Sequence, residues 1–118
     1  MSQHAKDATI KKAISLFNAG ELKKSLKETL RAKKKYPYEP LIFNLLGALY
    51  SQTGSFEDSI KNYLIAINLD PKYFEAHNNI GVAYTTWKKI DKAISHFDRA
   101  IQINPLYAEA YNNKGNAL

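Results

Sequence analysis

The three histidines, His4, His77 and His96, are the side chains best suited to bind a metal or to move a proton near neutral pH. Their spacing fits neither use, because no two of them stand three or four residues apart and no acidic cluster accompanies them. The sequence also lacks a glycine-rich phosphate loop and a G-x-S-x-G nucleophile motif. We therefore expect no metal, no cofactor and no enzymatic activity of the chain itself.

A basic run, Arg31–Lys35, is the second group that suggests chemistry, because it could contact nucleic-acid phosphates. The run also has a structural explanation, since cations stabilise the C-terminal end of a helix. Nucleic-acid-binding surfaces usually interleave aromatic side chains, and only Tyr36 follows here. Residues 1–37 contain ten Lys or Arg and three acidic residues, whereas residues 38–118 have a net charge of −1. Nucleic acid is thus an unlikely partner, and an acidic protein or a membrane surface is somewhat better supported.

The totals describe a single folded domain, residues 1–118. The chain has 118 residues, of which 45% are hydrophobic and 24% charged, and it has no cysteine. No apolar stretch is long enough to span a membrane, and the first residues lack the apolar core of a secretion signal. These features predict a cytoplasmic protein.

An internal repeat of 34 residues organises the chain. Pro37, Pro71 and Pro105 are each 34 positions apart. When the sequence is written in blocks of 34 residues, each position of the repeat forms a column, and residues of the same kind recur in several columns. These are the small residues Ala13, Gly47, Gly81 and Gly115; Ser25, Ser59 and Ala93; Ala32, Ala66 and Ala100; and the large residues Leu16, Tyr50, Tyr84 and Leu118. Such agreement predicts tandem copies of one structural unit.

Each unit is expected to form two helices. Apolar residues recur at helical spacing in residues 43–50 and again in Ile60, Tyr63, Leu64 and Ile67. Between these segments, Gly54 suits the left-handed conformation that ends a helix, and Ser55 suits an N-cap. Asp70-Pro71 then ends the second helix, because proline disfavours helical geometry in the residue before it.

The columns also predict packing roles. Gly47 and Gly81 are expected where two helices approach so closely that only a small side chain fits. His77 shares a column of large residues with Phe43, so it is expected to be a packing residue. His96 is expected on an outer helix face.

The 34-residue helix–turn–helix resembles the tetratricopeptide repeat, most clearly in FNLLGALYSQTGSFEDSIKNYLIAINLDP and HNNIGVAYTTWKKIDKAISHFDRAIQINP. The resemblance implies an all-α fold in which tandem helix-turn-helix repeats stack as a right-handed α-solenoid. It places repeats at residues 6–39, 40–73 and 74–107, and the first helix of a fourth at residues 108–118. Because that last unit has no second helix, we expect the chain to be part of a longer protein.

Two repeats depart from the family pattern. Repeat one has Thr9, Lys12 and Ala13 where an aromatic residue, Leu and Gly are usual, as expected for a repeat that caps the array. Repeat three has Lys88 in place of the turn glycine, which predicts a distorted turn.

In this family the first helices of successive repeats line a concave groove that binds polypeptides. Asparagine suits such a ligand, because its side chain offers both a donor and an acceptor to an extended backbone. The resemblance implies that the peptide-binding groove of this chain is lined by Ile14, Asn44, Leu45, Asn78, Asn79, Thr86, Asn112 and Asn113.

Asn79 and Asn113, one repeat apart, resemble the asparagine ladder in the repeat region of O-linked N-acetylglucosamine transferases. Lys11 and Leu45 occupy the same column earlier, so the ladder is incomplete, and a generic preference for asparagine explains the pair equally well. A basic clamp for a C-terminal carboxylate is not expected, since Lys11 is the groove's one cation.

Two functions remain open. The leading hypothesis is a protein–protein interaction scaffold that binds an extended peptide or partner segment in the groove. The resemblance alone further suggests that the chain is the substrate-recruiting module of a larger transferase. The alternative is a structural self-association module. The uncovered face with Ala110, Ala117 and Leu118 predicts a homodimer through the C-terminal end.

Overall fold

The computed structural model describes residues 7–118, so His4 and the start of the first expected repeat lie outside the described residues. Within residues 7–118 the chain forms seven helices and no strand, which confirms the all-α class. The helices are α1 (Ala8–Asn18), α2 (Leu22–Lys35), α3 (Pro40–Gln52), α4 (Phe56–Leu69), α5 (Phe74–Thr86), α6 (Ile90–Ile103) and α7 (Ala108–Ala117).

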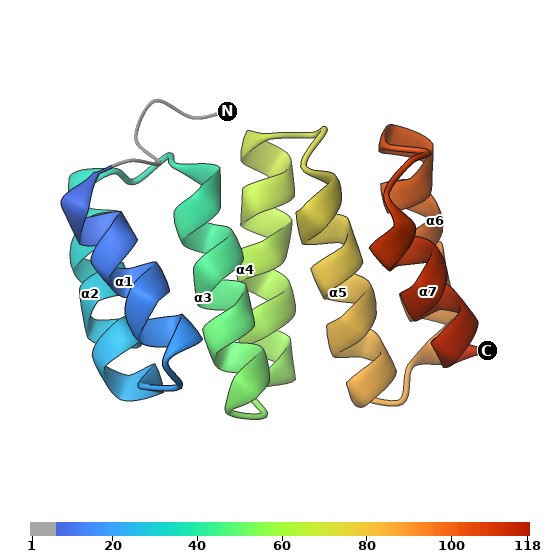
Figure 1. Cartoon of the computed structure of the whole chain (residues 1–118), viewed down its shortest axis with the longest axis horizontal. Coiled ribbons are helices and arrows are strands. Elements are labelled where there is room, and N and C mark those ends of the chain that lie inside the picture. The colour runs from blue at the N-terminus through green and yellow to red at the C-terminus, as the bar shows by residue number, and fades with distance from the viewer. Residues whose placement is uncertain (1–6) are drawn as a thin grey trace.

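Successive helices form antiparallel pairs, and the pairs stack side by side into a solenoid. In Figure 1, α1, α3, α5 and α7 lie on the near side and α2, α4 and α6 lie behind them. Each helix packs against its neighbours in sequence, and α3 and α5 also contact each other directly. This arrangement is the expected solenoid of three hairpins followed by a single helix.

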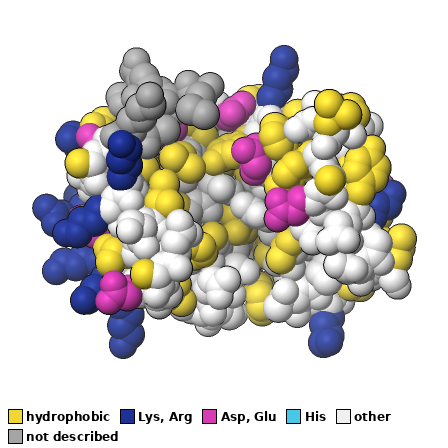
Figure 2. All heavy atoms as spheres, in the orientation of Figure 1, with side chains coloured by type: hydrophobic (Ala, Val, Ile, Leu, Met, Phe, Trp, Pro, Cys, Tyr) yellow, Lys and Arg dark blue, Asp and Glu magenta, His cyan; other side chains and the backbone are white. Residues whose placement is uncertain are grey.

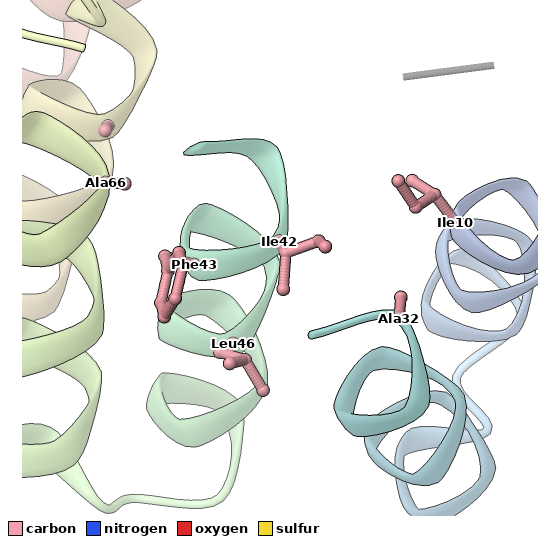
Figure 3. Close-up of a cluster of buried hydrophobic side chains, with 7 residues drawn as sticks. Ile10, Ala32, Ile42, Phe43, Leu46 and Ala66 are labelled. Carbon is pink, nitrogen blue, oxygen red and sulfur yellow. The ribbon is translucent and has the colours of Figure 1, made fainter. Parts of the chain in front are cut away.

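The apolar core lies between successive helices rather than at one centre. Figure 3 shows Ile42 of α3 turned toward Ile10 of α1 and Ala32 of α2, while Phe43 points toward the side of Ala66 in α4. All five side chains are buried. Because each layer is shared by adjacent hairpins, the stability of the stack depends on contacts between neighbours.

Gly47 and Gly81 allow an aromatic ring to lie directly against α3 and α5. A Cβ atom at Gly47 would lie 2.5 Å from the ring of Tyr63, and one at Gly81 would lie 2.4 Å from the ring of Phe97. The expected close approach is therefore confirmed, and in each case the ring comes from the second helix of the same pair. A Cβ atom at Gly115, in the same column, would meet no atom within 4 Å.

The three turns within the hairpins share one backbone conformation. Gly20 and Gly54 have φ angles of 79° and 81°, and Lys88 has a φ of 63°. The predicted distortion of the third turn is therefore wrong, since Lys88 adopts the left-handed conformation that the glycines adopt. That conformation is strained in a residue with a Cβ atom.

The ends of α4 only partly follow the sequence signals. The helix ends at Leu69 with Asp70 as its C-cap, as the Asp-Pro pair predicts. Ser55 is the N-cap, but its side chain makes no capping hydrogen bond. The backbone closes this turn instead, since Ser55 N–H donates to the carbonyl of Tyr50.

The basic residues gather at one end of the array. Figure 2 shows Lys and Arg side chains clustered over the end that holds α1 and α2. Lys33, Lys34 and Lys35 form the last turn of α2 and are exposed, as the helix-end explanation predicts. Lys12, which replaces the usual Leu, lies 3.6 Å from the Glu28 carboxylate, so an ion pair replaces the usual apolar contact.

None of the helices in the described part of the chain is both long and apolar enough to cross a membrane.

Candidate functional site

A cavity of about 380 Å³ opens between α1, α3 and α5. Most of its lining is apolar, and its polar edge consists of amide and hydroxyl side chains without a charged group. The lining residues are Ile14 and Phe17 from α1, Leu41, Asn44, Leu45, Ala48, Ser51 and Gln52 from α3, Tyr63 from α4, and Asn79 and Val82 from α5. The cavity can therefore hold an apolar side chain beside groups that bind a backbone.

Two asparagine pairs connect consecutive hairpins along this side of the array. Asn79 Nδ2 donates a hydrogen bond of 3.1 Å to Asn44 Oδ1, and Asn113 Nδ2 donates one of 3.1 Å to Asn78 Oδ1. Each pair joins residues 35 positions apart, so the same connection is repeated one period later. We call these two pairs the amide rungs.

Two tyrosines lie beside the acceptor asparagines of the rungs. Tyr73 lies beside Asn44 and Tyr107 lies beside Asn78, and the Tyr107 hydroxyl donates a hydrogen bond of 2.7 Å to Glu109 Oε2. Burial, followed by the nearby Glu75 carboxylate, raises the pKa of Tyr73 well above its usual range. The Tyr73 hydroxyl therefore stays neutral beside Asn44.

The structure brings four of the eight predicted groove residues to the cavity, namely Ile14, Asn44, Leu45 and Asn79. The other four lie elsewhere. Asn78 is only 1% exposed, so it supports Asn113 and has no surface for a ligand. Asn112 and Thr86 are exposed, and the Thr86 hydroxyl donates to the Val82 carbonyl in its own helix.

The sequence reasoning missed the tyrosines of the site. Tyr63 belongs to a second helix, and the family pattern assigns groove residues to first helices only. Tyr73 and Tyr107 stand one period apart, two residues after the repeated prolines. This 34-residue spacing could have indicated that the two tyrosines share a role.

A histidine pair was also missed. His77 Nδ1 lies 3.3 Å from His96 Nδ1, and the His96 ring also stacks on Tyr84. The prediction that His96 lies on an outer face is thus wrong, whereas His77 is buried as a packing residue should be. Burial, then His96, then Arg99, lowers the pKa of His77 to about 4. Two imidazoles fall short of a metal centre, and residues 7–118 contain no group of three His, Cys, Asp or Glu side chains that could hold a metal ion.

The C-terminal end is less open than expected. Ala110 is fully buried because α7 packs against both α5 and α6, which corrects its assignment to an exposed face. Lys114 contributes to this packing through an ion pair of 2.7 Å with Asp98. Leu118 remains 81% exposed, and Ala117 is half-buried.

Sequence comparison gives two overlapping family matches. The family model described as "TPR repeat" matches residues 47–86, and the one described as "Tetratricopeptide repeat" matches residues 74–107. Together they cover residues 47–107, which is more than half of the chain. None of the curated proteins matches the sequence.

Three solved structures show the same fold at low sequence identity. The first TPR of Spaghetti (RPAP3) bound to the HSP90 peptide SRMEEVD is 19% identical, with a TM-score of 0.85 over 92% of this chain and 86% of that one. The second TPR domain of human RPAP3, in complex with the HSP70 peptide SGPTIEEVD, is also 19% identical, with a TM-score of 0.84 over 93% of this chain and 92% of that one.

The third structure is the O-GlcNAc transferase of Thermobaculum terrenum. It is 24% identical with a TM-score of 0.87, and the match covers all of this chain but 23% of the transferase. The 34-residue period, the paired helices and the two family matches agree, and the chain belongs to the tetratricopeptide-repeat family.

Proposed function

We propose that this chain is a protein-interaction module that binds an extended segment of a partner polypeptide, and that it is not itself an enzyme. The observation that carries the proposal is the open cavity beside the Asn44–Asn79 rung. The peptides seen in the similar TPR domains support it, because they occupy domains of this fold.

The Asn44–Asn79 rung keeps spare hydrogen-bonding capacity. An asparagine side chain has two N–H donors and an oxygen that accepts twice. The rung uses one N–H of Asn79, and the side chains of Asn44 and Asn79 are both half-buried at the edge of the cavity. Their remaining groups suit the alternating N–H and C=O groups of an extended backbone, whatever the side chains of the ligand are.

The cavity adds a preference for an apolar ligand residue. Phe17, Leu41 and Val82 are among its walls, and Val82 is 42% exposed. Burying a Leu- or Phe-sized side chain there contributes about 1.5–3 kcal/mol. No Lys or Arg lines the cavity, so the ligand differs from the acidic peptides of the similar domains. We propose a neutral segment with a large apolar residue.

A peptide array probed with the purified chain tests this proposal. Val82→Glu places a charge in the cavity wall and should abolish binding of neutral apolar peptides. Leu106→Glu is the matched control, because Leu106 is 91% exposed and lies outside the cavity. If no peptide binds, or if Val82→Glu binds as well as Leu106→Glu does, the groove is not the site.

We further propose that the chain recruits polypeptide substrates for a larger transferase. It is supported by the similarity to the Thermobaculum enzyme and by the resemblance of Asn79 and Asn113 to an asparagine ladder. The test is to fuse the chain to a transferase catalytic domain. Peptides that the groove binds should then be modified faster than scrambled peptides, and equal rates would argue against recruitment.

Self-association is the rival function, and one observation favours it. Leu106, Tyr111 and Leu118 are 91%, 51% and 81% exposed at the C-terminal end, and such apolar surface often finds a partner. Sedimentation over a wide concentration range should detect a dimer that Leu118→Asp disrupts. A monomer at all concentrations would exclude this function.

A further inference from the structure

A second recess lies apart from the groove, between α4, the end of α5 and α6. It has a volume of about 420 Å³ and shares no lining residue with the groove cavity. Its main lining residues are Lys61, Leu64, Tyr84, Trp87, Lys89 and Lys92, and we call this surface the lysine–aromatic pocket.

The floor of the pocket is aromatic and apolar. Trp87 stacks on Tyr84 with ring centroids 6.2 Å apart, and on Phe56 at 5.9 Å. Leu64 belongs to the apolar stripe of α4, yet it is 47% exposed, because it faces this recess instead of a helix. An apolar side chain of a partner can therefore be covered here on several sides.

The rim is cationic. Lys89 Nζ lies 4.5 Å from the centroid of the Trp87 ring, and Lys92 Nζ lies 5.8 Å from that of Tyr84. Lys61 adds a third ammonium group, and Glu57 is the one carboxylate among the lining residues. A rim with this excess of positive charge favours a partner that carries several carboxylates.

Comparison with the preceding repeat shows that the fold itself does not require this chemistry. One period earlier, Thr53, Ser55 and Asp58 stand in place of Trp87, Lys89 and Lys92. The third turn also places Lys88 in a left-handed backbone conformation that Gly54 provides without strain. Strain that the fold can avoid points to a role in function.

We propose that the lysine–aromatic pocket binds a second partner segment, an acidic stretch of polypeptide that carries a large apolar residue. The apolar residue enters between Leu64 and the aromatic rings, and the flanking carboxylates pair with Lys61, Lys89 and Lys92. A nucleobase would need an open ring face. The Trp87 ring already contacts Phe56, Tyr84 and Lys89, so a peptide side chain is the better occupant.

Trp87 is the single tryptophan of the chain, so its fluorescence reports on this pocket directly. The probe is the synthetic peptide DEDLFEDE, acetylated and amidated so that it has no terminal charge. We expect a saturable change in tryptophan emission, weakened by added salt. The peptide DEDGSEDE, which lacks the apolar pair, should bind at least about tenfold more weakly, the difference that about 1.4 kcal/mol produces.

Two charge-matched double variants complete the experiment and keep Trp87 as the reporter. Lys89→Ser with Lys92→Asp restores the residues of repeat two and should weaken binding of DEDLFEDE at least about tenfold. Lys27→Ser with Lys34→Asp makes the same change of charge at exposed positions of α2 and should leave binding within about twofold of the parent. Circular dichroism melts establish that both variants are folded.

Several outcomes would overturn the proposal: no saturable change at about 1 mM peptide, equal binding of DEDGSEDE, or equal loss in both double variants. Tighter binding of the oligonucleotide dT8 than of DEDLFEDE would assign the pocket to single-stranded nucleic acid instead. The groove variant Val82→Glu should not affect this binding, so failure here leaves the proposed function of the groove untouched.

Discussion

The Ser59 hydroxyl donates a hydrogen bond of 2.7 Å to the Gly47 carbonyl, which ties the two helices of the second hairpin together. Ser25 makes the same bond to Ala13 at 2.8 Å one repeat earlier. Both serines are fully buried. In the third hairpin the serine is replaced by Ala93.

Removing the serine hydroxyl should therefore destabilise the array. We expect Ser59→Ala to lower the free energy of unfolding by about 0.5–1.5 kcal/mol, the usual net value of such a bond. Thermal or urea unfolding measures the change. Ser55→Ala is the control, because Ser55 is exposed and makes no side-chain cap; an equal loss there would mean that the buried bond contributes little.

Gly81→Ala should cost at least about 1–3 kcal/mol, because its Cβ would overlap the ring of Phe97 in a packed layer. Gly81→Leu, which adds more atoms at the same place, should be worse. Gly115→Ala is the matched control from the same column. It should stabilise α7 by about 0.5–1 kcal/mol, since the added methyl group meets no atom and alanine favours the helix. Unfolding midpoints that move the same way in both variants would contradict the close approach at Gly81.

Lys88→Gly should raise the free energy of unfolding by about 1 kcal/mol, because glycine adopts the left-handed conformation without strain. Lys89→Gly is the adjacent control. Its φ of −107° suits any residue, so glycine there should give no gain. A thermal melt distinguishes the two, and a gain at both positions would show that loss of positive charge is the cause.

Acid should destabilise the third hairpin through its histidine pair. The pKa of His77 falls from 6.5 to about 4 on folding, so the unfolded chain binds more protons in this interval. The contribution of neutral His77 to the free energy of unfolding is complete above about pH 6.5 and is lost as the pH falls toward 4. At pH 5 the loss is at most about 2 kcal/mol.

His77→Phe tests this contribution, because Phe43 occupies the same column in repeat two. The variant should unfold with a smaller dependence on pH between 7.5 and 5 than the parent. The Tyr36 hydroxyl lowers the pKa of Asp7, so the contribution of Asp7 to stability is lost only below its ordinary pKa of 3.8 and does not disturb the comparison. An unchanged pH dependence would mean that folding does not lower the pKa of His77.

The variant Asn79→Ala should weaken a groove peptide, the lost hydrogen bond contributing about 0.5–1.5 kcal/mol. Neutralising Lys33, Lys34 and Lys35 should affect only the salt dependence of association, because these side chains lie in the last turn of α2 and outside the cavity. Fluorescence anisotropy of a labelled array peptide compares the two. If the lysine variant alone loses binding, the partner is acidic and does not use the groove.

The period of 34 residues was sufficient to predict the helices, because prolines, small residues and apolar stripes recur together. It also placed Gly47 and Gly81 correctly, since only a close neighbour explains small residues in a packed column. The site was less predictable. Asn78 and Asn79 are adjacent in sequence, yet a rotation of about 100° along the helix separates a buried residue from one that faces the cavity.

The histidine pair could not be predicted for a related reason. His77 and His96 are 19 residues apart, and their contact depends on how α5 and α6 face each other. Periodicity reports which face of a helix is apolar. It does not report which two side chains meet across an interface between helices.

The amide rungs also affect how strongly the joints between consecutive hairpins resist opening. Each rung crosses the joint between consecutive hairpins on the groove side, so opening the groove stretches it from 3.1 Å. An extension of about 1 Å is enough to break such a bond. The rung therefore resists small displacements at the joint and no longer does so once it breaks. A bound backbone that takes over the amides of Asn44 and Asn79 would release that joint, which would couple ligand occupancy to the curvature of the solenoid.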